Sequence, residues 1–256
     1  MHPVLLSLLI SLGINAAFFV FAALRKTDVV TDLSYSLSFA AVVLMLVLIK
    51  GVSDTYRLMA AAMVIIWAAR LGSYLLGRIL VSRKDHRFDG IRDKPLKFAG
   101  FWILQAITVA IVLVPVSITV SNDNVSRSFS IVSIAGAAIW LIGMLLETTA
   151  DAQKSTFKRS EQSGFMKSGL WSWSRHPNYF GEMLLWAGVY IYCLPELGAD
   201  SVSALVGPVW ITTMLLFVSG IPLLEKAADG KYGGQTDYEE YKRKVSIFLP
   251  WPPKRI

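Results

Sequence analysis

The sequence predicts an all-α integral membrane protein, a bundle of seven transmembrane helices, and three observations support this prediction. Of the 256 residues, 54% are hydrophobic and only 17% are charged, whereas a soluble globular chain carries about 25% charged residues. Seven apolar segments are long enough, or nearly so, to cross a hydrocarbon core about 30 Å thick. Lysine and arginine collect in alternate loops between these segments. No repeat or long polar linker divides residues 1–256, so we expect a single domain.

The first apolar segment, residues 3–24, lacks a basic region at its start and a clear small-x-small cleavage site. We therefore expect a retained helix rather than a signal peptide. The sixth segment, residues 179–194, is the shortest, which favours a helix that is tilted inward or only partly exposed to lipid. The remaining predicted spans are residues 33–49, 56–81, 98–120, 129–149 and 202–224.

The basic residues predict the orientation of the chain. Of the 25 Lys and Arg residues, 21 fall in the first, third and fifth loops and the C-terminal tail. Lys50, Arg57 and Arg127 fall on the opposite side, and Arg70 lies inside a predicted helix. This bias predicts an external N-terminus and a cytoplasmic C-terminus. It also explains the net charge of +7 by topology and by attraction to anionic membrane lipids, so no nucleic-acid partner is expected.

The stretch GLWSWSRHPNYFGEMLLW, residues 169–186, carries the most distinctive pattern. Aromatic and basic residues precede Pro177, which suits the first turn of a helix because the missing N–H has no intrahelical partner there. Asn178 and Glu182 are four residues apart and share one helical face. Polar groups at the edge of a membrane span are costly unless they are used, so we expect the wall of a ligand site. His176 could be a base, a phosphate contact or a capping residue.

Arg70, Tyr74 and Arg78 are spaced by four residues and line one face of the predicted helix 56–81. Arg78 could be an end residue that extends to the headgroups, and Tyr74 an ordinary membrane tyrosine. Arg70 favours a functional face, since a charge inside a span usually faces a cavity or a partner. A tyrosine between two guanidinium groups could act as a proton donor.

The predicted fifth helix ends in LLETTADAQKSTFK, where Glu147 and Asp151 are followed on the same face by Lys154 and Lys158. Two interpretations stay open. The residues could form a solvated helix end whose ion pairs contribute a few tenths of a kcal/mol, about 0.2–0.5 each. Alternatively, the acids could accept hydrogen bonds from hydroxyl or amide groups while the lysines meet phosphate. The basic loop 82–97 could likewise be a topology signal or a mouth for phosphates.

The remaining motifs limit the kinds of site available. Tyr238 and Tyr241 lie at i and i+3 on a short helix, a spacing that more often reflects interfacial packing than ligand contact. Three histidines and one cysteine show no zinc-ligand spacing, and the single Cys193 precludes an intramolecular disulfide. Neither GxGxxG nor GxxxxGKS occurs. Any nucleotide cofactor would therefore have to be held between helices.

Three motifs together, SRHPNYFGE, ETTADAQKSTFK and DYEEYKRKVSIFLPWPP, resemble the steroid 5α-reductase superfamily, most closely its bacterial domain-of-unknown-function branch. The resemblance covers residues 67–254. A weaker resemblance links the chain to isoprenylcysteine carboxyl methyltransferases, which carry a similar RHPxYxG block. Glu225 and the pair Tyr238 and Tyr241 match the looser continuation of that second pattern.

The reductase resemblance implies seven helices that enclose NADPH on the cytosolic side, with a lipidic substrate entering from the bilayer. It implies that Asn178 and Glu182 contact the nicotinamide end, and that Asp151 and Lys158 lie along the cofactor. Family members have arginine where this chain has Lys158. The full set of cofactor-binding residues that we predict is Glu147, Asp151, Lys158, Arg175, His176, Asn178, Tyr179, Glu182, Tyr238 and Tyr241.

The implied reaction transfers a hydride to the C=C of a lipidic, steroid-like or enone substrate, while negative charge develops on the carbonyl oxygen. Tyr74 matches the tyrosine that polarises this carbonyl, and Asp32 stands as its acidic partner where the family has a glutamate on an earlier helix. A donor aimed at that oxygen stabilises the charge strongly in a dry pocket. The bacterial branch implies the inner membrane, with the active site facing the cytoplasm.

Two other functions remain open. A membrane methyltransferase would use S-adenosylmethionine, a smaller cofactor with little need for the basic residues of loop 83–92. A non-enzymatic lipid-binding or structural membrane protein predicts that Asn178→Ala and Tyr74→Phe leave every ligand-dependent property unchanged.

Overall fold

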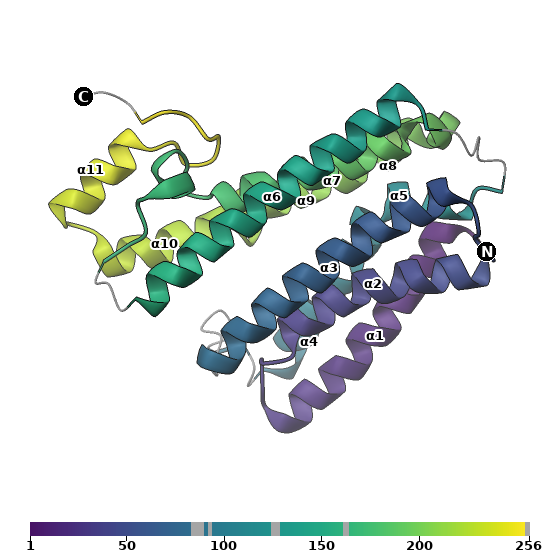
Figure 1. The fold of residues 1–256 in the computed structure, drawn as a ribbon. Helices are drawn as coiled ribbons and strands as arrows, with labels where there is room; N and C mark the ends of the chain where they lie inside the picture. Colours follow the sequence, from purple (N-terminus) through teal and green to yellow (C-terminus); the bar gives the residue numbers. More distant parts are fainter. Residues whose placement is uncertain (83–89, 92–93, 124–128, 161–163, 254–256) are drawn as a thin grey trace. The chain divides into compact units, whose positions relative to one another are not determined.

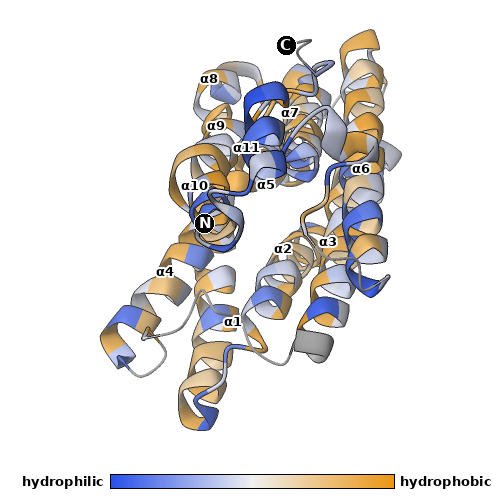
Figure 2. Ribbon diagram, turned by 90° about the vertical axis from the view of Figure 1, so that its left-hand side faces the viewer, coloured by the Kyte–Doolittle hydropathy of each residue, from blue (hydrophilic) through white to orange (hydrophobic). Residues whose placement is uncertain are grey.

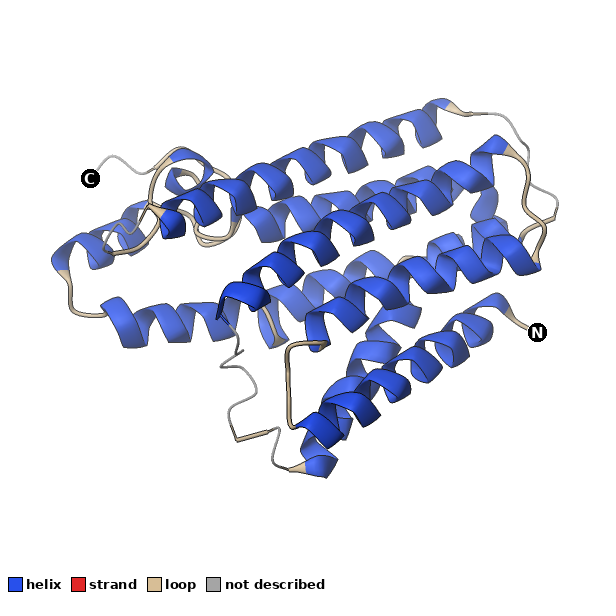
Figure 3. Cartoon of the chain, turned by 60° about the horizontal axis from the view of Figure 1, so that its bottom comes forward, coloured by secondary structure: helices blue, strands red, loops and turns tan. Residues whose placement is uncertain are grey.

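The computed structural model is built of α-helices, as the sequence predicts (Figures 1 and 3). It describes residues 1–82, 90–91, 94–123, 129–160 and 164–253. The chain groups into two compact units. The first unit comprises residues 1–134 and 189–207, and the second comprises residues 135–188 and 208–256. The single-domain assignment stays a prediction.

Five helices form most of the first unit. They are α1 (Pro3–Arg25), α2 (Thr31–Ile49), α3 (Thr55–Ser82), α4 (Pro95–Val112) and α5 (Val114–Ser121). Helix α2 packs against α3, while α1 packs against both α2 and α4. The end of α7 (Pro177–Leu197), the short 3₁₀ turn η3 (Gly198–Asp200) and α8 (Ser201–Ala204) complete this unit.

Polar side chains join the helices of the first unit in its interior. Gln105 of α4 donates from Nε2 to Asn15 Oδ1 of α1 at 2.7 Å and to Ser34 Oγ of α2 at 2.9 Å. Asn15 in turn donates from Nδ2 to Ser38 Oγ at 3.0 Å. Apolar side chains gain little from packing against one another in lipid, so interhelical hydrogen bonds of this kind help to hold a membrane bundle together.

In the second unit, α6 (Ile131–Arg159) and α7 approach each other through glycines. A Cβ atom on Gly143 would lie 2.6 Å from the carbonyl oxygen of Gly181. One on Gly181 would lie 2.6 Å from the backbone nitrogen of Glu147, and one on Gly188 would lie 2.4 Å from that of Trp140. Small residues let two backbones approach this closely. The contact places the end of α6 beside the start of α7.

The remaining segments of the chain complete the second unit. A 3₁₀ turn, η2 (Gly169–Ser172), precedes α7. After α9 (Val206–Thr213) come the π-helical turn η4 (Met214–Val218), α10 (Ile221–Tyr232) and the hydrophilic helix α11 (Thr236–Lys244) (Figure 2).

Among the described residues, six helices are long and apolar enough to cross a membrane. They are Pro3–Arg25, Thr31–Ile49, Thr55–Ile79, Pro95–Val112, Ile131–Arg159 and Val206–Tyr232. Many large apolar side chains on these helices are exposed, including Leu48 and Phe217. The chain is therefore an integral membrane protein. The seventh span, at residues 179–194, and the orientation of the chain stay predictions.

Helix boundaries differ from the prediction at three places. The expected span 98–120 is two helices that meet at Leu113, because Pro115 in the first turn of α5 has no N–H to continue the ladder of α4. The expected span 202–224 is divided into α8, α9, η4 and the start of α10. Helix α6 begins at Ile131 and runs to Arg159, past the expected span 129–149, and ETTADAQKSTFK is helical as its spacing predicts.

Candidate functional site

The loop before α7 is tied to α6, and this fixes where α7 begins. Gly169 has a φ of +62°, and a Cβ there would lie 2.6 Å from Gln153 Oε1, so the position suits only glycine. The backbone N–H of Leu170 donates to that same Gln153 oxygen at 3.0 Å. Trp171 donates from its indole Nε1 to the carbonyl oxygen of Ala150 at 3.0 Å.

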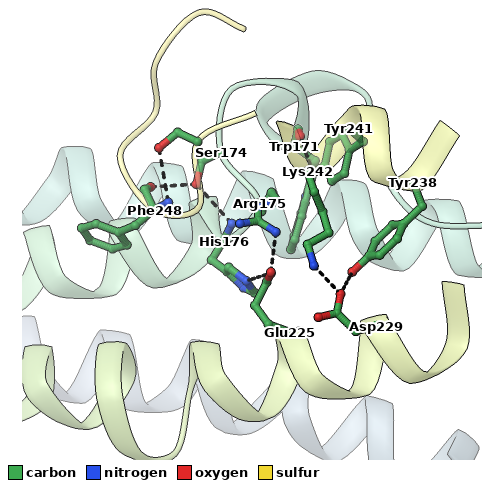
Figure 4. Close-up of polar contacts among 11 residues, drawn as sticks. Trp171, Ser174, Arg175, His176, Glu225, Asp229, Tyr238, Tyr241, Lys242 and Phe248 are labelled. Carbon is green, nitrogen blue, oxygen red and sulfur yellow. Dashed lines mark hydrogen bonds and ion pairs between the residues drawn. The ribbon is translucent and has the colours of Figure 1, made fainter. Parts of the chain in front are cut away.

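The C-terminal segment holds the same loop from its other side (Figure 4). Ser174 donates from Oγ to the carbonyl oxygen of Phe248 at 2.7 Å and accepts from the backbone N–H of His176 at 3.1 Å. The backbone N–H of Arg175 donates to the carbonyl oxygen of Ser246 at 2.8 Å. The approach to α7 is therefore fixed by hydrogen bonds from two sequence-distant segments.

Glu225 of α10 binds the two residues that precede Pro177 (Figure 4). Its Oε1 lies 2.7 Å from His176 Nε2, and its Oε2 pairs with the Arg175 guanidinium. Burial lowers the pKa of His176 from its ordinary value of 6.5, although the contact with Glu225 raises it in part. A neutral imidazole that donates Nε2–H to Glu225 leaves Nδ1 as a hydrogen-bond acceptor.

Three polar atoms at this site are buried and lack a hydrogen-bond partner within the described chain: His176 Nδ1, Asn178 Oδ1 and Arg175 Nε. Buried polar atoms in proteins are nearly always paired, and leaving one unpaired costs about 1–3 kcal/mol. Asn178 uses its Nδ2 to donate to Asp151 Oδ1 at 3.2 Å, which orients its Oδ1. The site therefore offers two acceptors and one donor to a ligand.

Buried acids of α6 and α7 surround the same helix start. Glu147, Asp151 and Glu182 are 2%, 4% and 8% exposed. These values exclude the solvated-helix-end interpretation for the two acids of α6. Lys154 lies over the Trp171 ring at 4.5 Å from its centroid, and Lys158 is exposed one turn further along α6. Tyr179 stacks on His176 with ring centroids 5.8 Å apart.

Tyr238 and Tyr241 of α11 both have protein partners. Tyr238 donates to Asp229 Oδ1 at 2.8 Å, an atom that Lys242 also binds at 2.6 Å. Tyr241 donates to the carbonyl oxygen of Trp171 at 2.7 Å. Burial raises the pKa of both phenols, so both are neutral donors at pH 7. These contacts agree with the packing interpretation, and a cofactor role for the two tyrosines stays a prediction.

The predicted catalytic residues lie in the first unit, whereas the predicted cofactor residues lie in the second. Asp32 Oδ2 forms an ion pair with the Arg78 guanidinium at 2.7 Å. The Arg70 guanidinium lies over the Tyr74 ring at 5.5 Å from its centroid. Arg70, Tyr74 and Arg78, the three residues of the predicted helical face, thus each make a close contact. The catalytic roles of Tyr74 and Asp32 stay predictions.

Sequence reasoning missed several residues that shape the site. Ser174 and Gln153 orient the loop, and Ser246 and Phe248 receive its hydrogen bonds. Ser174 is the first residue of the SRHPNYFGE motif, and that position could have drawn attention to it, whereas main-chain acceptors leave no trace in a sequence. The basic residues Arg83, Lys84, Arg87 and Arg92, predicted as a mouth for phosphates, lie outside the described residues.

The fold and the site define a helical integral membrane protein with a buried polar site at the start of α7. The chain belongs to the family described as "Protein of unknown function (DUF1295)", which matches residues 18–245. This match, together with the similarity to a bovine steroid dehydrogenase, confirms the predicted resemblance to the steroid 5α-reductase superfamily.

Two curated proteins are similar to the chain. An uncharacterised protein of Schizosaccharomyces pombe is 24% identical over 214 residues, 72% of this chain and 60% of that protein. The 3-oxo-5-alpha-steroid 4-dehydrogenase 1 of Bos taurus is 33% identical over 57 residues, 22% of each chain. The chain thus spans less than two thirds of the length of each. No solved structure matches it.

Proposed function

We propose that the chain is a membrane reductase that uses NADPH to reduce the C=C of a lipidic, α,β-unsaturated carbonyl substrate. Two findings support the class of reaction: the family match and the 57-residue similarity to the bovine steroid dehydrogenase. The bias of lysine and arginine supports an external N-terminus and a site that faces the cytoplasm. The resemblance to the bacterial branch supports the inner membrane as its location.

The observation that carries the proposal is the pair of buried acceptors, His176 Nδ1 and Asn178 Oδ1. The nicotinamide of NADPH ends in a carboxamide, whose NH₂ group supplies the hydrogen-bond donors that these atoms require. Lys154 and Lys158 follow on α6 and supply positive charge for phosphates. The residues present therefore fit this cofactor, which would supply the hydride.

Each side chain of the site has a defined role in this proposal. Asn178, oriented by Asp151, and His176, oriented by Glu225, would hold the carboxamide end. Tyr74 would donate a hydrogen bond to the substrate carbonyl as negative charge develops on its oxygen. Asp32, which pairs with Arg78, would serve as the acidic partner of Tyr74.

One observation favours a second candidate, a methyltransferase that uses S-adenosylmethionine. The structure brings Glu225 to Arg175 and His176, and these are the residues of the RHPxYxG block and the later glutamate that the methyltransferase resemblance requires. Such a cofactor would also bring hydrogen-bond donors to the buried acceptors. It carries no phosphate, however, and so makes no use of the positive charge of Lys154 and Lys158.

Thermal unfolding of the detergent-purified chain with added NADPH, NADH or S-adenosylmethionine tests the proposal. A ligand at one hundred times its Kd stabilises the folded state by about 2.7 kcal/mol, so we expect NADPH to raise the unfolding midpoint. Asn178→Ala should abolish this rise. Asn122→Ala is the matched control, because Asn122 lies in the first unit and donates to the carbonyl oxygen of Glu196.

The other outcomes separate the candidates. A rise with S-adenosylmethionine alone would replace the reductase by the methyltransferase. Equal responses of Asn178→Ala and Asn122→Ala to NADPH would show that the nucleotide binds elsewhere. No response to any of the three compounds would favour the lipid-binding or structural function.

A further inference from the structure

The residues that follow α11 form an irregular segment with an exposed apolar face. We call residues 245–251 the C-terminal strap. Ile247, Leu249 and Trp251 are 43%, 58% and 70% exposed, whereas Val245 is buried and Phe248 is half-buried. The exposed residues of the strap are thus all large and apolar.

This apolar face is held in place rather than loosely attached. Main-chain hydrogen bonds join the strap to the loop before α7, from Arg175 N–H to the Ser246 carbonyl at 2.8 Å and from Trp251 N–H to the Trp173 carbonyl at 3.0 Å. Trp173 itself is 48% exposed. Four large apolar side chains are therefore presented outward together, and a soluble surface rarely shows such a group unless a partner covers it.

The depth of the strap relative to the span of α6 indicates which partner covers it. The apolar part of α6 ends at Leu146, and Glu147 is its first charged residue. The loop that holds the strap meets α6 at Ala150, through Trp171. Three residues of helix correspond to about 4.5 Å, and the headgroup layer extends about 5–7 Å beyond the hydrocarbon core. The loop contact therefore lies at headgroup depth.

The charges beside the strap suit an anionic lipid surface. Helix α11 ends in Lys242, Arg243 and Lys244, and Lys254 and Arg255 follow the strap in the sequence. Arg243 is exposed. Tryptophan favours the membrane interface, and lysine or arginine beside it contacts anionic headgroups. An apolar, tryptophan-containing segment with basic residues on both sides has the composition of an interfacial anchor.

We propose that the C-terminal strap and Trp173 lie in the headgroup layer of the leaflet that the basic residues assign to the cytoplasm, where they bind an anionic lipid surface. The strap is bonded to Ser174 and Arg175, the two residues before His176. Lipid contact therefore stabilises the loop that carries the candidate site, and this holds whichever ligand that site binds.

A fluorescent label on the strap tests the proposal with the full chain. Cys193, the sole cysteine, is buried, so Trp251→Cys or Leu249→Cys can be labelled selectively with an environment-sensitive dye. Each variant keeps the main-chain bonds of the strap. Thr236→Cys is the matched control, because Thr236 is exposed at the opposite end of α11. The labelled proteins are reconstituted in phosphatidylcholine vesicles with and without phosphatidylglycerol.

We expect emission from positions 249 and 251 to shift to the blue and to be quenched several-fold more by nitroxide-labelled lipids than emission from position 236. Phosphatidylglycerol should increase this quenching. Iodide in the buffer should quench position 236 most. Equal quenching of all three positions by iodide would overturn the proposal. Protection that persists in detergent and grows with protein concentration would also overturn it, because a second copy of the chain would then be the occupant.

Discussion

The first and second units differ in how their buried polar groups are hydrogen-bonded. In the first unit, the amides of Asn15 and Gln105 are bonded to one another and to Ser34 and Ser38. In the second unit, His176 and Asn178 each form one bond to a carboxylate, and each retains a buried acceptor that no described residue satisfies. The comparison separates a network that stabilises the fold from a group of residues that we propose binds a ligand.

The contrast has a consequence for substitutions at the two places. Protein groups complete the Asn15–Gln105 network, so removing one member leaves the others unpaired and destabilises the fold. No residue that the structure describes completes the His176–Asn178 group. Removing Asn178 should therefore affect ligand binding far more than the stability of the ligand-free protein. Three substitutions, in order of decreasing expected effect, test this distinction.

The largest effect is expected at Gly181, which supports the geometry of the second unit. A Cβ at this position meets backbone on both sides, 2.6 Å from Glu147 N and 2.8 Å from the Gly143 carbonyl oxygen. We expect Gly181→Ala to lower the free energy of unfolding by about 3 kcal/mol and to abolish stabilisation by ligand. Gly77→Ala is the control, because nothing lies within 4 Å of a Cβ there. Denaturant titration in micelles measures both, and a Gly181→Ala variant as stable as Gly77→Ala would contradict the close helix contact.

A smaller effect is expected at Gln105, compared directly with Asn178. Gln105→Leu leaves Asn15 Oδ1 without its donor, and we expect a loss of about 1–2 kcal/mol in unfolding free energy. Asn178→Leu should cost less in the absence of ligand, because it also removes an unsatisfied acceptor. With ligand present the order should reverse. Unfolding midpoints measured with and without NADPH provide the comparison. A larger loss for Asn178→Leu without ligand would mean that its role is structural.

Much of the fold was predictable from the sequence, because hydropathy and length identify spans without reference to their neighbours. The spans at residues 3–24, 33–49 and 56–81 each agree with an observed helix to within a few residues. The break at Leu113 was missed because hydropathy is continuous across it. Pro115 lies inside this apolar run and forms part of the first turn of a new helix. The division of the span 202–224 was missed because a π-helical turn has no simple residue pattern.

The candidate site was predictable only in part. Asn178 and Asp151 were recognised from helical spacing and from the family motifs, and the structure brings them together. The contact of Glu225 with Arg175 and His176 joins residues about 50 apart in sequence, and periodicity carries no information about such pairs. The hydrogen bonds of Ser174 with Phe248 and His176 depend on main-chain atoms, which every residue has.

The smallest effect concerns the charge of His176 and depends on pH. Burial lowers its pKa below 6.5, so between that value and the lower folded-state pKa the unfolded chain binds more protons than the folded chain. Unfolding free energy therefore rises with pH through this window. The stability from a neutral His176 is fully present above pH 6.5 and is lost as the pH falls. His176→Gln, which cannot titrate, should flatten this part of the profile.

Ligand binding should depend on the protonation of His176 as well. Protonation of His176 places a hydrogen on Nδ1 and converts the buried acceptor into a donor, so a ligand that donates a hydrogen bond there loses it. We expect the rise in midpoint caused by NADPH to shrink in the wild-type chain as the pH falls from 7 through the lowered pKa of His176. It should be smaller but independent of pH in His176→Gln. If the NADPH response falls with pH equally in both chains, the titration belongs to another group. His176 would then be a residue that stabilises the fold without binding the ligand, as the members of the Asn15–Gln105 network do.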